Sequence, residues 1–352
     1  MQNINKRLFE ALLIGTVGGF VFNYFHLPLP WMLGSLTFVM LWQAFTNRIL
    51  DFPAFCKDAG LVVLGAYFGL YFTAATFMTV APYFIHYVIA TILLIGFSIF
   101  LSTLVSKWIA IDEITSVFSS IPGGLTEMAI ASESLNAKSS YVVIFQTVRL
   151  LTVLFTIPPF IILLFGRNGA TISSPITSPV NFIFDWNYLW FILPFVIGYF
   201  VRNIIPAGIV IGSMVVTVIL NVSPITLPIL PEFILIIAQI MIGISLGKSI
   251  LLSDLKAGGK YCLIYFSIAV LLIMMAFLLG VLFSAVTDID LVTALLSLAP
   301  GGLIEMVLTA SQVGADPALV SAFQLTRILI IVIFVPIVLK WYFKRKEQVV
   351  GC

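Results

Sequence analysis

Two nearly identical phrases hold most of the residues in this sequence that could do chemistry. The phrase "IPGGLTEM" begins at Ile121, and "APGGLIEM" begins at Ala299. In each phrase a proline and two glycines break the chain before a glutamate, and a Gln-x-x-Arg motif follows at the same distance. A helix that restarts after such a break points its free N–H groups at the gap, where anions bind. The predicted substrate-binding residues are Pro122, Gly123, Gly124, Glu127, Gln146, Arg149, Pro300, Gly301, Gly302, Glu305, Gln324 and Arg327.

The two arginines of these motifs need compensation for their charge. Arg149 and Arg327 each lie about nine residues into a long apolar segment, where a charge costs at least about 2.5–3.5 kcal/mol. The glutamine three residues before each arginine lies on the same helical face. We expect either a bound substrate or an ion pair with Glu127 or Glu305 to compensate each arginine, and the sequence leaves both alternatives open.

The two glutamates fall within about one turn of the predicted helix starts. Three roles are open for Glu127 and Glu305: complementing the helix dipole, carrying a proton or a cation through a cavity, or forming a plain ion pair. Asp112 and Asp290 precede the same segments, and we expect them to begin the helices there.

The composition predicts that the elements holding these residues lie in a membrane. Of the 352 residues, 61% are hydrophobic and 9% are charged, whereas a soluble domain carries about a quarter charged residues. Several apolar runs approach the roughly 20 residues of a membrane helix, and they do not alternate as the strands of a membrane β-barrel do. The sequence therefore predicts an all-α polytopic membrane protein whose surroundings are the lipid bilayer.

Other kinds of chemistry find little support. Two scattered histidines and three unclustered cysteines supply no metal-ligand set, so we predict no metal, no cofactor and no catalytic residue. The net charge of +2 argues against direct nucleic-acid binding. The lack of a Walker motif argues against ATP as the direct energy source.

The second phrase is part of a duplication that covers the whole chain. Pro300 lies 178 positions after Pro122, and across the phrases and the motifs that follow, the two copies share 13 of 41 residues. A stretch rich in Gly, Ser, Thr and Pro separates the two copies. We predict a first membrane repeat, a linker and a second membrane repeat at residues 1–165, 166–185 and 186–352.

Each repeat is predicted to contain about five transmembrane helices and one PGG-broken re-entrant segment. If the PGG segment enters and leaves on the same face, most Lys and Arg residues fall on the cytoplasmic side, as do both termini. An odd number of crossings inverts the second repeat, which is how many secondary transporters are built. The apolar segments are 8–26, 30–46, 58–80, 82–105, 114–134 and 140–165, with partners 186–202, 207–222, 234–252, 262–285, 291–312 and 318–340.

The duplication, the two PGGLxEM phrases and the Gln-x-x-Arg motifs resemble the AbrB duplication family of bacterial inner-membrane proteins over nearly the full length. Members of that family carry the labels transcriptional regulator and ammonia monooxygenase. The resemblance implies a multi-pass protein of the bacterial inner membrane. A monooxygenase needs clustered metal ligands, which this sequence lacks. No polar segment is long enough to form a soluble DNA-binding domain.

The function that these residues favour is secondary transport of a small solute, with an anion held between the two PGG segments. A proton or sodium ion at the two glutamates is a candidate coupling ion, and an oligomer is compatible with the sequence. The alternative is a membrane sensor that uses the same cavity and influences gene expression indirectly.

Overall fold

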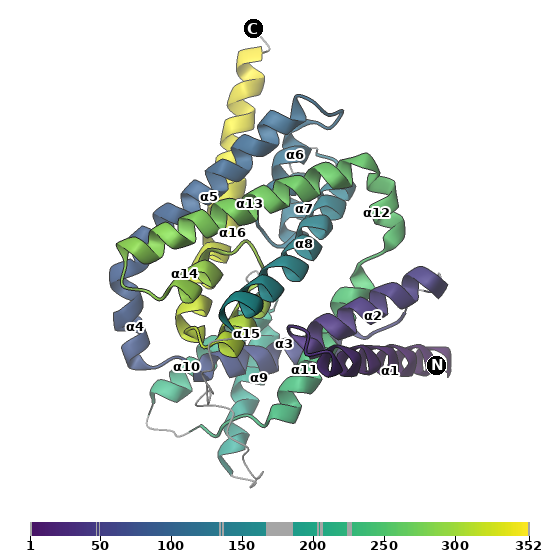
Figure 1. Ribbon diagram of the computed structural model, residues 1–352, viewed down its shortest axis with the longest axis vertical. Helices are drawn as coiled ribbons and strands as arrows, with labels where there is room; N and C mark the ends of the chain where they lie inside the picture. The colour runs from purple at the N-terminus through teal and green to yellow at the C-terminus, as the bar shows by residue number, and fades with distance from the viewer. Residues whose placement is uncertain are drawn as a thin grey trace. The chain divides into compact units, whose positions relative to one another are not determined.

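The structure is a computed structural model that describes residues 2–46, 48, 50–133, 135, 137–166, 186–202, 204, 207–223 and 227–350 (Figure 1). The described residues form helices and contain no β-strand. In the first half the helices are α1 (Gln2–Tyr24), α2 (Pro30–Thr46), α3 (Ala54–Leu70), α4 (Ala74–Val80), η1 (Ala81–Tyr83), α5 (Phe84–Ser106), α6 (Glu113–Ser120), α7 (Leu125–Glu133) and α8 (Ser139–Phe165). Of the predicted linker, all but Gly166 lies outside the described residues.

The second half repeats this order. Its helices are η2 (Trp186–Phe191), α9 (Ile192–Val201), α10 (Gly208–Val222), α11 (Glu232–Ser249), α12 (Leu252–Gly258), α13 (Lys260–Val286), α14 (Leu291–Leu298), α15 (Leu303–Val313) and α16 (Pro317–Val350). Helices α10, α11, α12, α14, α15 and α16 each begin 178 positions after α2, α3, α4, α6, α7 and α8. The offset found in the sequence is therefore also the offset of the folded elements.

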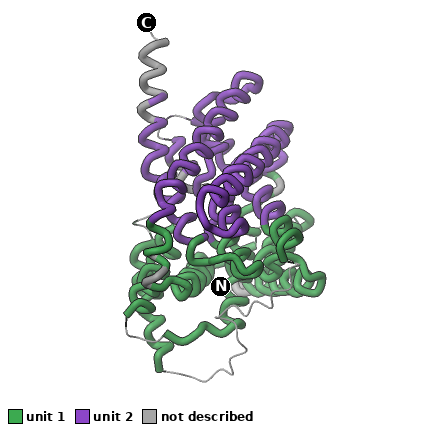
Figure 2. The backbone as a smooth tube through the Cα atoms, turned by 60° about the vertical axis from the view of Figure 1, so that its left-hand side comes forward, with its two compact units in different colours: residues 1–81, 158–253, 304–319 green, residues 82–157, 254–303, 320–352 purple. Residues whose placement is uncertain are grey.

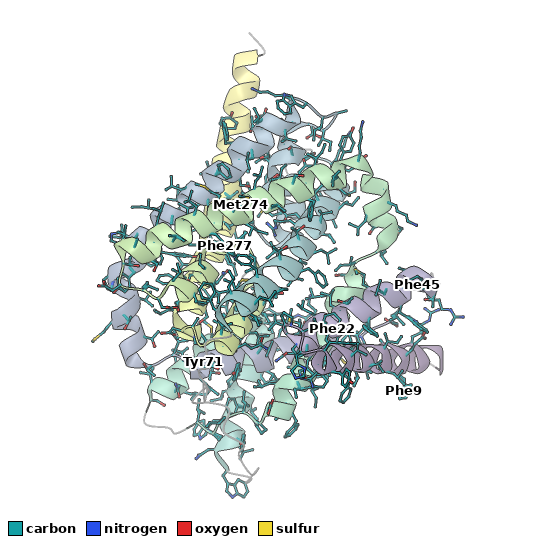
Figure 3. The ribbon with its side chains drawn as sticks, in the orientation of Figure 1. Phe9, Phe22, Phe45, Tyr71, Met274 and Phe277 are labelled. Carbon is teal, nitrogen blue, oxygen red and sulfur yellow. The ribbon has the colours of Figure 1, made fainter. Side chains whose placement is uncertain are left out.

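The chain is an all-α polytopic membrane protein, as the composition predicts. Among the described residues, five helices are long and apolar enough to cross a bilayer: Met78–Ser106, Ser139–Phe165, Glu232–Ser249, Lys260–Val286 and Pro317–Leu339. Large apolar side chains are exposed on the helices, including Phe9, Phe45 and Met274 (Figure 3). Phe45 is 82% exposed and Met274 is 63% exposed, which suits a lipid surrounding and would be unfavourable in water. The count of five crossings in each repeat stays a prediction.

The predicted segment 58–80 is two helices and not one. Helix α3 ends at Leu70, and α4 begins at Ala74. The side-chain amide of Asn221 donates to the carbonyls of Leu70 (3.2 Å) and Phe72 (2.8 Å), so the chain can leave the helix with these acceptors satisfied. The Thr76 hydroxyl accepts from the Thr73 N–H at 3.1 Å, which is one of the two hydrogen bonds of a capping box.

The described chain forms two compact units (Figure 2). Unit 1 comprises residues 1–81, 158–253 and 304–319, and unit 2 comprises residues 82–157, 254–303 and 320–352. Each unit takes segments from both halves of the sequence.

Close glycine contacts join the two halves within unit 1. A Cβ at Gly65 would meet Val210 O and the Ser213 hydroxyl on α10, and a Cβ at Gly243 would meet Met32 O and Ser35 on α2. Because Val210 and Ser213 lie 178 positions after Met32 and Ser35, the second contact is the first with the halves exchanged. The GxxxG spacing of α3 and α11 thus serves close helix packing.

The same exchange occurs in unit 2. Tyr265 of the second half stacks on Phe145 of the first, with ring centroids 3.9 Å apart, and Tyr87 of the first stacks on Phe323 of the second at 4.5 Å. The Tyr265 hydroxyl donates to Ser116 Oγ at 3.0 Å, and the Tyr87 hydroxyl donates to the Ser297 carbonyl at 3.1 Å. The two tyrosines, and likewise the two phenylalanines, are equivalent positions of the duplication.

Exchanged contacts of this kind are what a two-fold axis produces. Equivalent residues then meet at the axis itself. In unit 1 the equivalent positions Gly60 and Ala238 do so, since a Cβ added at Gly60 would lie 3.0 Å from the Ala238 carbonyl oxygen. In a membrane such an axis can lie along the bilayer normal or in its plane, and only the second arrangement inverts one repeat. The inversion stays a prediction.

Substituting the packed glycines tests the helix packing of unit 1. A Cβ at Gly243 or Gly247 would press on backbone atoms of α2, so we expect Gly243→Ala to destabilise the protein by about 1–3 kcal/mol. Gly96→Ala is the matched control, since no atom lies within 4 Å of a Cβ there, and helix propensity alone should stabilise it by about 0.5–1 kcal/mol. Thermal unfolding in detergent measures both, and equal stability of Gly243→Ala and the wild type would contradict the packing.

Candidate functional site

The PGG phrases break two helices, as the sequence predicts. Helix α6 ends at Ser120 and α7 begins at Leu125, while α14 ends at Leu298 and α15 begins at Leu303. The Gly123 N–H donates to the Ile121 carbonyl at 2.7 Å, and in the second copy the Gly301 N–H donates to the Ala299 carbonyl at 2.8 Å. Each break is therefore a three-residue turn centred on a proline, whose fixed φ and missing N–H suit that position.

The described glycines of the phrases do not adopt a left-handed backbone. Among the described residues the glycines with positive φ are Gly259 and Gly314, and none belongs to a PGG phrase. A Cβ at Gly123 would lie 2.8 Å from Cγ and Cε of Met128, which is itself fully buried. At Gly123 the residue type therefore serves the need for space beside the turn and not an unusual backbone angle.

Short capped helices lead into the two breaks. The Asp112 carboxylate accepts from the Thr115 N–H at 2.9 Å, and the Asp290 carboxylate accepts from the Val292 and Thr293 N–H groups at 3.0 and 3.2 Å. The prediction that both aspartates begin helices is confirmed. Since α6 and α14 have eight residues each, about 12 Å of helix at 1.5 Å per residue, neither could cross a bilayer alone.

In the first copy the Gln-x-x-Arg motif of α8 holds the broken end of α6. Arg149 donates from Nη1 to the Ile121 carbonyl at 2.7 Å and from Nη2 to the Gly123 carbonyl at 2.9 Å. Gln146 donates from Nε2 to the Phe118 and Ile121 carbonyls at 2.6 and 3.0 Å. These are the carbonyls that lose helical partners at the break, so the motif satisfies them where lipid cannot.

The second copy uses the same hydrogen bonds. Arg327 donates from Nη1 to the Ala299 carbonyl and from Nη2 to the Gly301 carbonyl, the latter at 2.6 Å. Gln324 donates from Nε2 to the Leu296 and Ala299 carbonyls at 2.7 and 3.2 Å. One difference is that Gln324 Oε1 accepts from Arg327 Nη2, whereas the buried Oε1 of Gln146 has no partner.

Neither arginine has a carboxylate partner among the described side chains of unit 2. Arg149 is 8% exposed and Arg327 is 2% exposed, and neither forms an ion pair in the described part of unit 2. The buried Nε–H of each lacks a hydrogen-bond partner. Backbone carbonyls supply partial negative charge there, but no carboxylate of the described part of unit 2 balances either arginine.

The structure gathers most of the predicted site residues in unit 2. Glu305 is the exception, since it lies in unit 1, where it is 5% exposed. Glu127 lies in α7, but its side chain is outside the described residues. Sequence reasoning missed Tyr87 and Tyr265, because an aromatic residue in an apolar run is typical of any membrane helix. The signal available in the sequence was that these two tyrosines lie 178 positions apart, which is the offset of the duplication.

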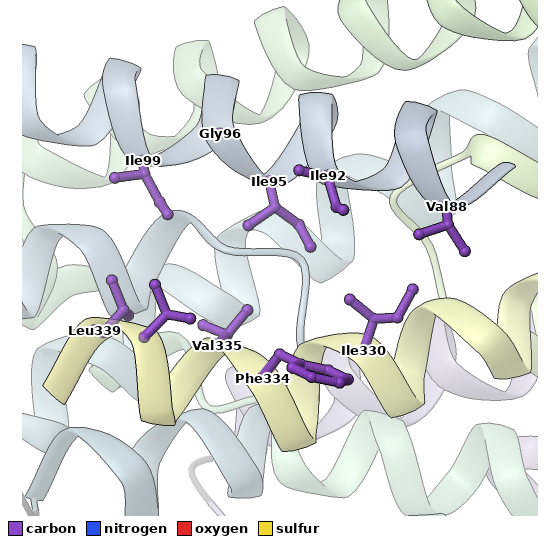
Figure 4. A pocket seen from close by; sticks show the side chains of 10 residues that line it. Val88, Ile92, Ile95, Gly96, Ile99, Ile330, Phe334, Val335 and Leu339 are labelled. Carbon is purple, nitrogen blue, oxygen red and sulfur yellow. The ribbon is translucent and has the colours of Figure 1, made fainter. Parts of the chain in front are cut away.

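A separate groove in unit 2 holds none of the predicted residues. It has a volume of about 430 Å³ and lies between α5 and α16 (Figure 4). Its lining is aliphatic and aromatic, with Ile92, Ile95 and Phe334 among the side chains. Because it offers no hydrogen-bonding or charged side chain, it does not suit a charged solute. No group of three or more His, Cys, Asp or Glu side chains that could hold a metal occurs among the described residues.

Comparison with known proteins places the chain in a family. The family model described as "Transition state regulatory protein AbrB" matches residues 31–343. The chain belongs to the AbrB family. It is 24% identical to "Uncharacterized protein YhjN" of Bacillus subtilis (strain 168), over 95% of this chain and 92% of the relative. It is also 24% identical to "Putative regulator AbrB" of Escherichia coli (strain K12), over 90% of each chain. No solved structure matches this AbrB-family chain.

Proposed function

We propose that the protein is a secondary transporter of a small anion, which binds beside Arg149 and Arg327. The supporting observation is the pair of buried guanidinium groups that have no ion-pair partner in the described part of unit 2. Each guanidinium also keeps an unused Nε–H donor. An anion would supply a counter-charge and accept a hydrogen bond from such a donor.

The scaffold around the arginines suits a carrier. Broken helices that face one another near the middle of the membrane form the substrate sites of many secondary transporters. Here both breaks are held by side chains of α8 and α16, so a movement of either helix would move a break and an arginine together. Glu305, which is buried in the second broken segment, is the candidate for coupling to a proton or a sodium ion. The proposed location is the bacterial inner membrane, with both termini in the cytoplasm.

A regulatory role is the second candidate, because the matching family model and the Escherichia coli relative both carry regulatory names. A membrane sensor would bind the same anion and pass on a conformational change without moving the solute. The buried arginines would serve either role, so a measurement of solute flux across the membrane is needed to distinguish a carrier from a sensor.

Flux through sealed vesicles tests the proposal. The full-length protein would be reconstituted in proteoliposomes, and uptake of radiolabelled organic anions would be followed with and without an imposed proton or sodium gradient. We expect saturable uptake that falls at least tenfold in Arg149→Gln. Arg202→Gln is the control, because Arg202 pairs with Asp58 at 3.2 Å in unit 1 and should leave uptake unchanged. Binding of an anion without uptake would favour the sensor.

A further inference from the structure

We infer that the groove between α5 and α16 binds one acyl chain of an anionic phospholipid, whose headgroup lies beside the basic residues that follow the two helices. The groove lies within unit 2 and shares no residue with the proposed anion site. Its volume of about 430 Å³ falls in the range of roughly 300–1,000 Å³ that is typical of ligand pockets. The inference is independent of whether the protein is a carrier or a sensor.

The lining of the groove suits a hydrocarbon chain. All ten residues that line it are Val, Ile, Leu, Phe or Gly, so no hydrogen-bonding side chain faces it. Ile95 and Val335 are buried at its floor, whereas Ile92 and Phe334 are 56% and 59% exposed at its rim. The groove is therefore open to the surroundings of the protein, and in a bilayer these surroundings are lipid chains.

The residue sizes in the groove favour a chain over another helix. Gly96 leaves room in the groove, because no atom lies within 4 Å of a Cβ added there. The other nine lining residues are large and apolar. Interfaces between membrane helices are instead enriched in small residues, which let the two backbones approach closely. A flexible acyl chain can fill the space between large side chains without such an approach.

The length of the groove matches one leaflet of the bilayer. Val88 and Ile99 are 11 positions apart in α5, which is about 16 Å of helix at 1.5 Å per residue. This is roughly half of the 30 Å hydrocarbon core. Residue numbers rise in the same direction on both sides of the groove, since Ile330 lies opposite Val88 and Leu339 lies opposite Ile99 (Figure 4). An acyl chain occupies one leaflet, whereas a helix of a second copy would cross both.

Basic and aromatic residues follow both helices at the same end of the groove. The membrane span of α5 ends at Ser106, and the next residues, Lys107 and Trp108, are both exposed. The span of α16 ends at Leu339, and the sequence continues with four basic residues and one acidic residue: Lys340, Lys344, Arg345, Lys346 and Glu347. Tryptophan is enriched at membrane interfaces, and clusters of about four to eight Lys and Arg residues beside a membrane helix attract anionic lipids. The charge at this end therefore complements an anionic headgroup.

Lipid binding by the wild-type protein tests the inference. The full-length protein would be stripped of lipid in detergent, and its affinities for phosphatidylglycerol and phosphatidylcholine with the same acyl chains would be measured by native mass spectrometry. We expect phosphatidylglycerol to bind at least fivefold more tightly. A phosphatidylglycerol with a photoreactive diazirine in its acyl chain should cross-link to residues 88–99 and 330–339. Equal affinity for the two lipids, or cross-links only elsewhere, would overturn the inference.

A variant that fills the groove tests the place of the acyl chain. In Gly96→Trp we expect the affinity for both lipids to fall at least fivefold, because the indole would occupy the open space. Leu93→Trp is the matched control, since Leu93 is 51% exposed on the same helix and does not line the groove. Thermal unfolding shows whether both variants are folded, and cross-linking of the wild type decides the question if Gly96→Trp is not. Unchanged lipid affinity in folded Gly96→Trp would contradict the proposed site.

A second variant tests the place of the headgroup. Replacing Lys344, Arg345 and Lys346 together by glutamine should reduce the preference for phosphatidylglycerol at least threefold and leave the affinity for phosphatidylcholine unchanged. An undiminished preference would refute the role of these charges. If a second copy of the chain covered the groove instead, Gly96→Trp would convert a dimer into a monomer and keep its bound lipid, and that result would also overturn the inference.

Discussion

Replacement of Arg327 by leucine should lower the thermal stability of the protein markedly. The Gly301 carbonyl and Oε1 of Gln324 would lose their charged donor at a point where the helix is broken and lipid offers no substitute. The Ala299 carbonyl would keep the Gly301 N–H and the Gln324 amide as donors. Each acceptor left without a partner costs about 1–3 kcal/mol. Removing a buried charge that no carboxylate of the described part of unit 2 balances returns part of this cost. The loss of hydrogen bonds is the larger effect, and we expect net destabilisation of about 1–4 kcal/mol.

Two further variants separate the hydrogen bonds from the charge. Arg327→Lys keeps the charge, but a single ammonium group cannot reproduce the planar fork that bridges two carbonyls, so its stability should be intermediate. Arg202→Leu removes a half-exposed ion pair with Asp58 and should cost about 0–1 kcal/mol. Thermal unfolding in detergent measures the order of stability of these variants. A leucine variant at position 327 as stable as the wild type would show that the carbonyl contacts do not hold the break.

The breaks and the repeated order of elements could be predicted from the sequence because their causes are local. Pro122 and Pro300 are each followed by two glycines, and this combination disfavours a continued helix, so they mark the breaks. Proline alone is a weaker signal, since Pro158 and Pro336 lie inside helices. Aspartate before a run of helix-forming residues marks a helix start, as Asp112 does. Because the two halves align at an offset of 178 residues, each of these predictions for the first half also applies to the equivalent residue of the second.

The partners of the arginines could not be predicted because hydrogen bonds to the backbone leave no residue type to search for. Arg149 and the carbonyl of Ile121 are 28 positions apart, and any residue at position 121 would offer the same acceptor. The sequence indicated a carboxylate or a bound substrate as the partner, whereas Nη1 and Nη2 of Arg149 donate to backbone carbonyls. The break between α3 and α4 was missed for a similar reason, because it depends on Asn221, which is distant in sequence.

The carrier account depends on opposite orientation of the two repeats in the bilayer. The exchanged contacts within each unit indicate a two-fold relation between the halves, and both possible directions of its axis would produce them. Only an axis in the plane of the membrane lets the two PGG breaks be approached from different compartments. Equivalent positions of the two repeats would then lie on opposite faces.

Cysteine labelling at two equivalent, exposed positions measures this orientation. Ala110 lies between α5 and α6, and Asp288 lies 178 positions later, between α13 and α14. In a background without the native cysteines, Ala110→Cys should react with a membrane-impermeant maleimide only from the cytoplasmic face, in inside-out vesicles. Asp288→Cys should react only from the outer face, in intact cells. Reaction of both cysteines from one face would mean that the repeats are parallel, and it would contradict the account.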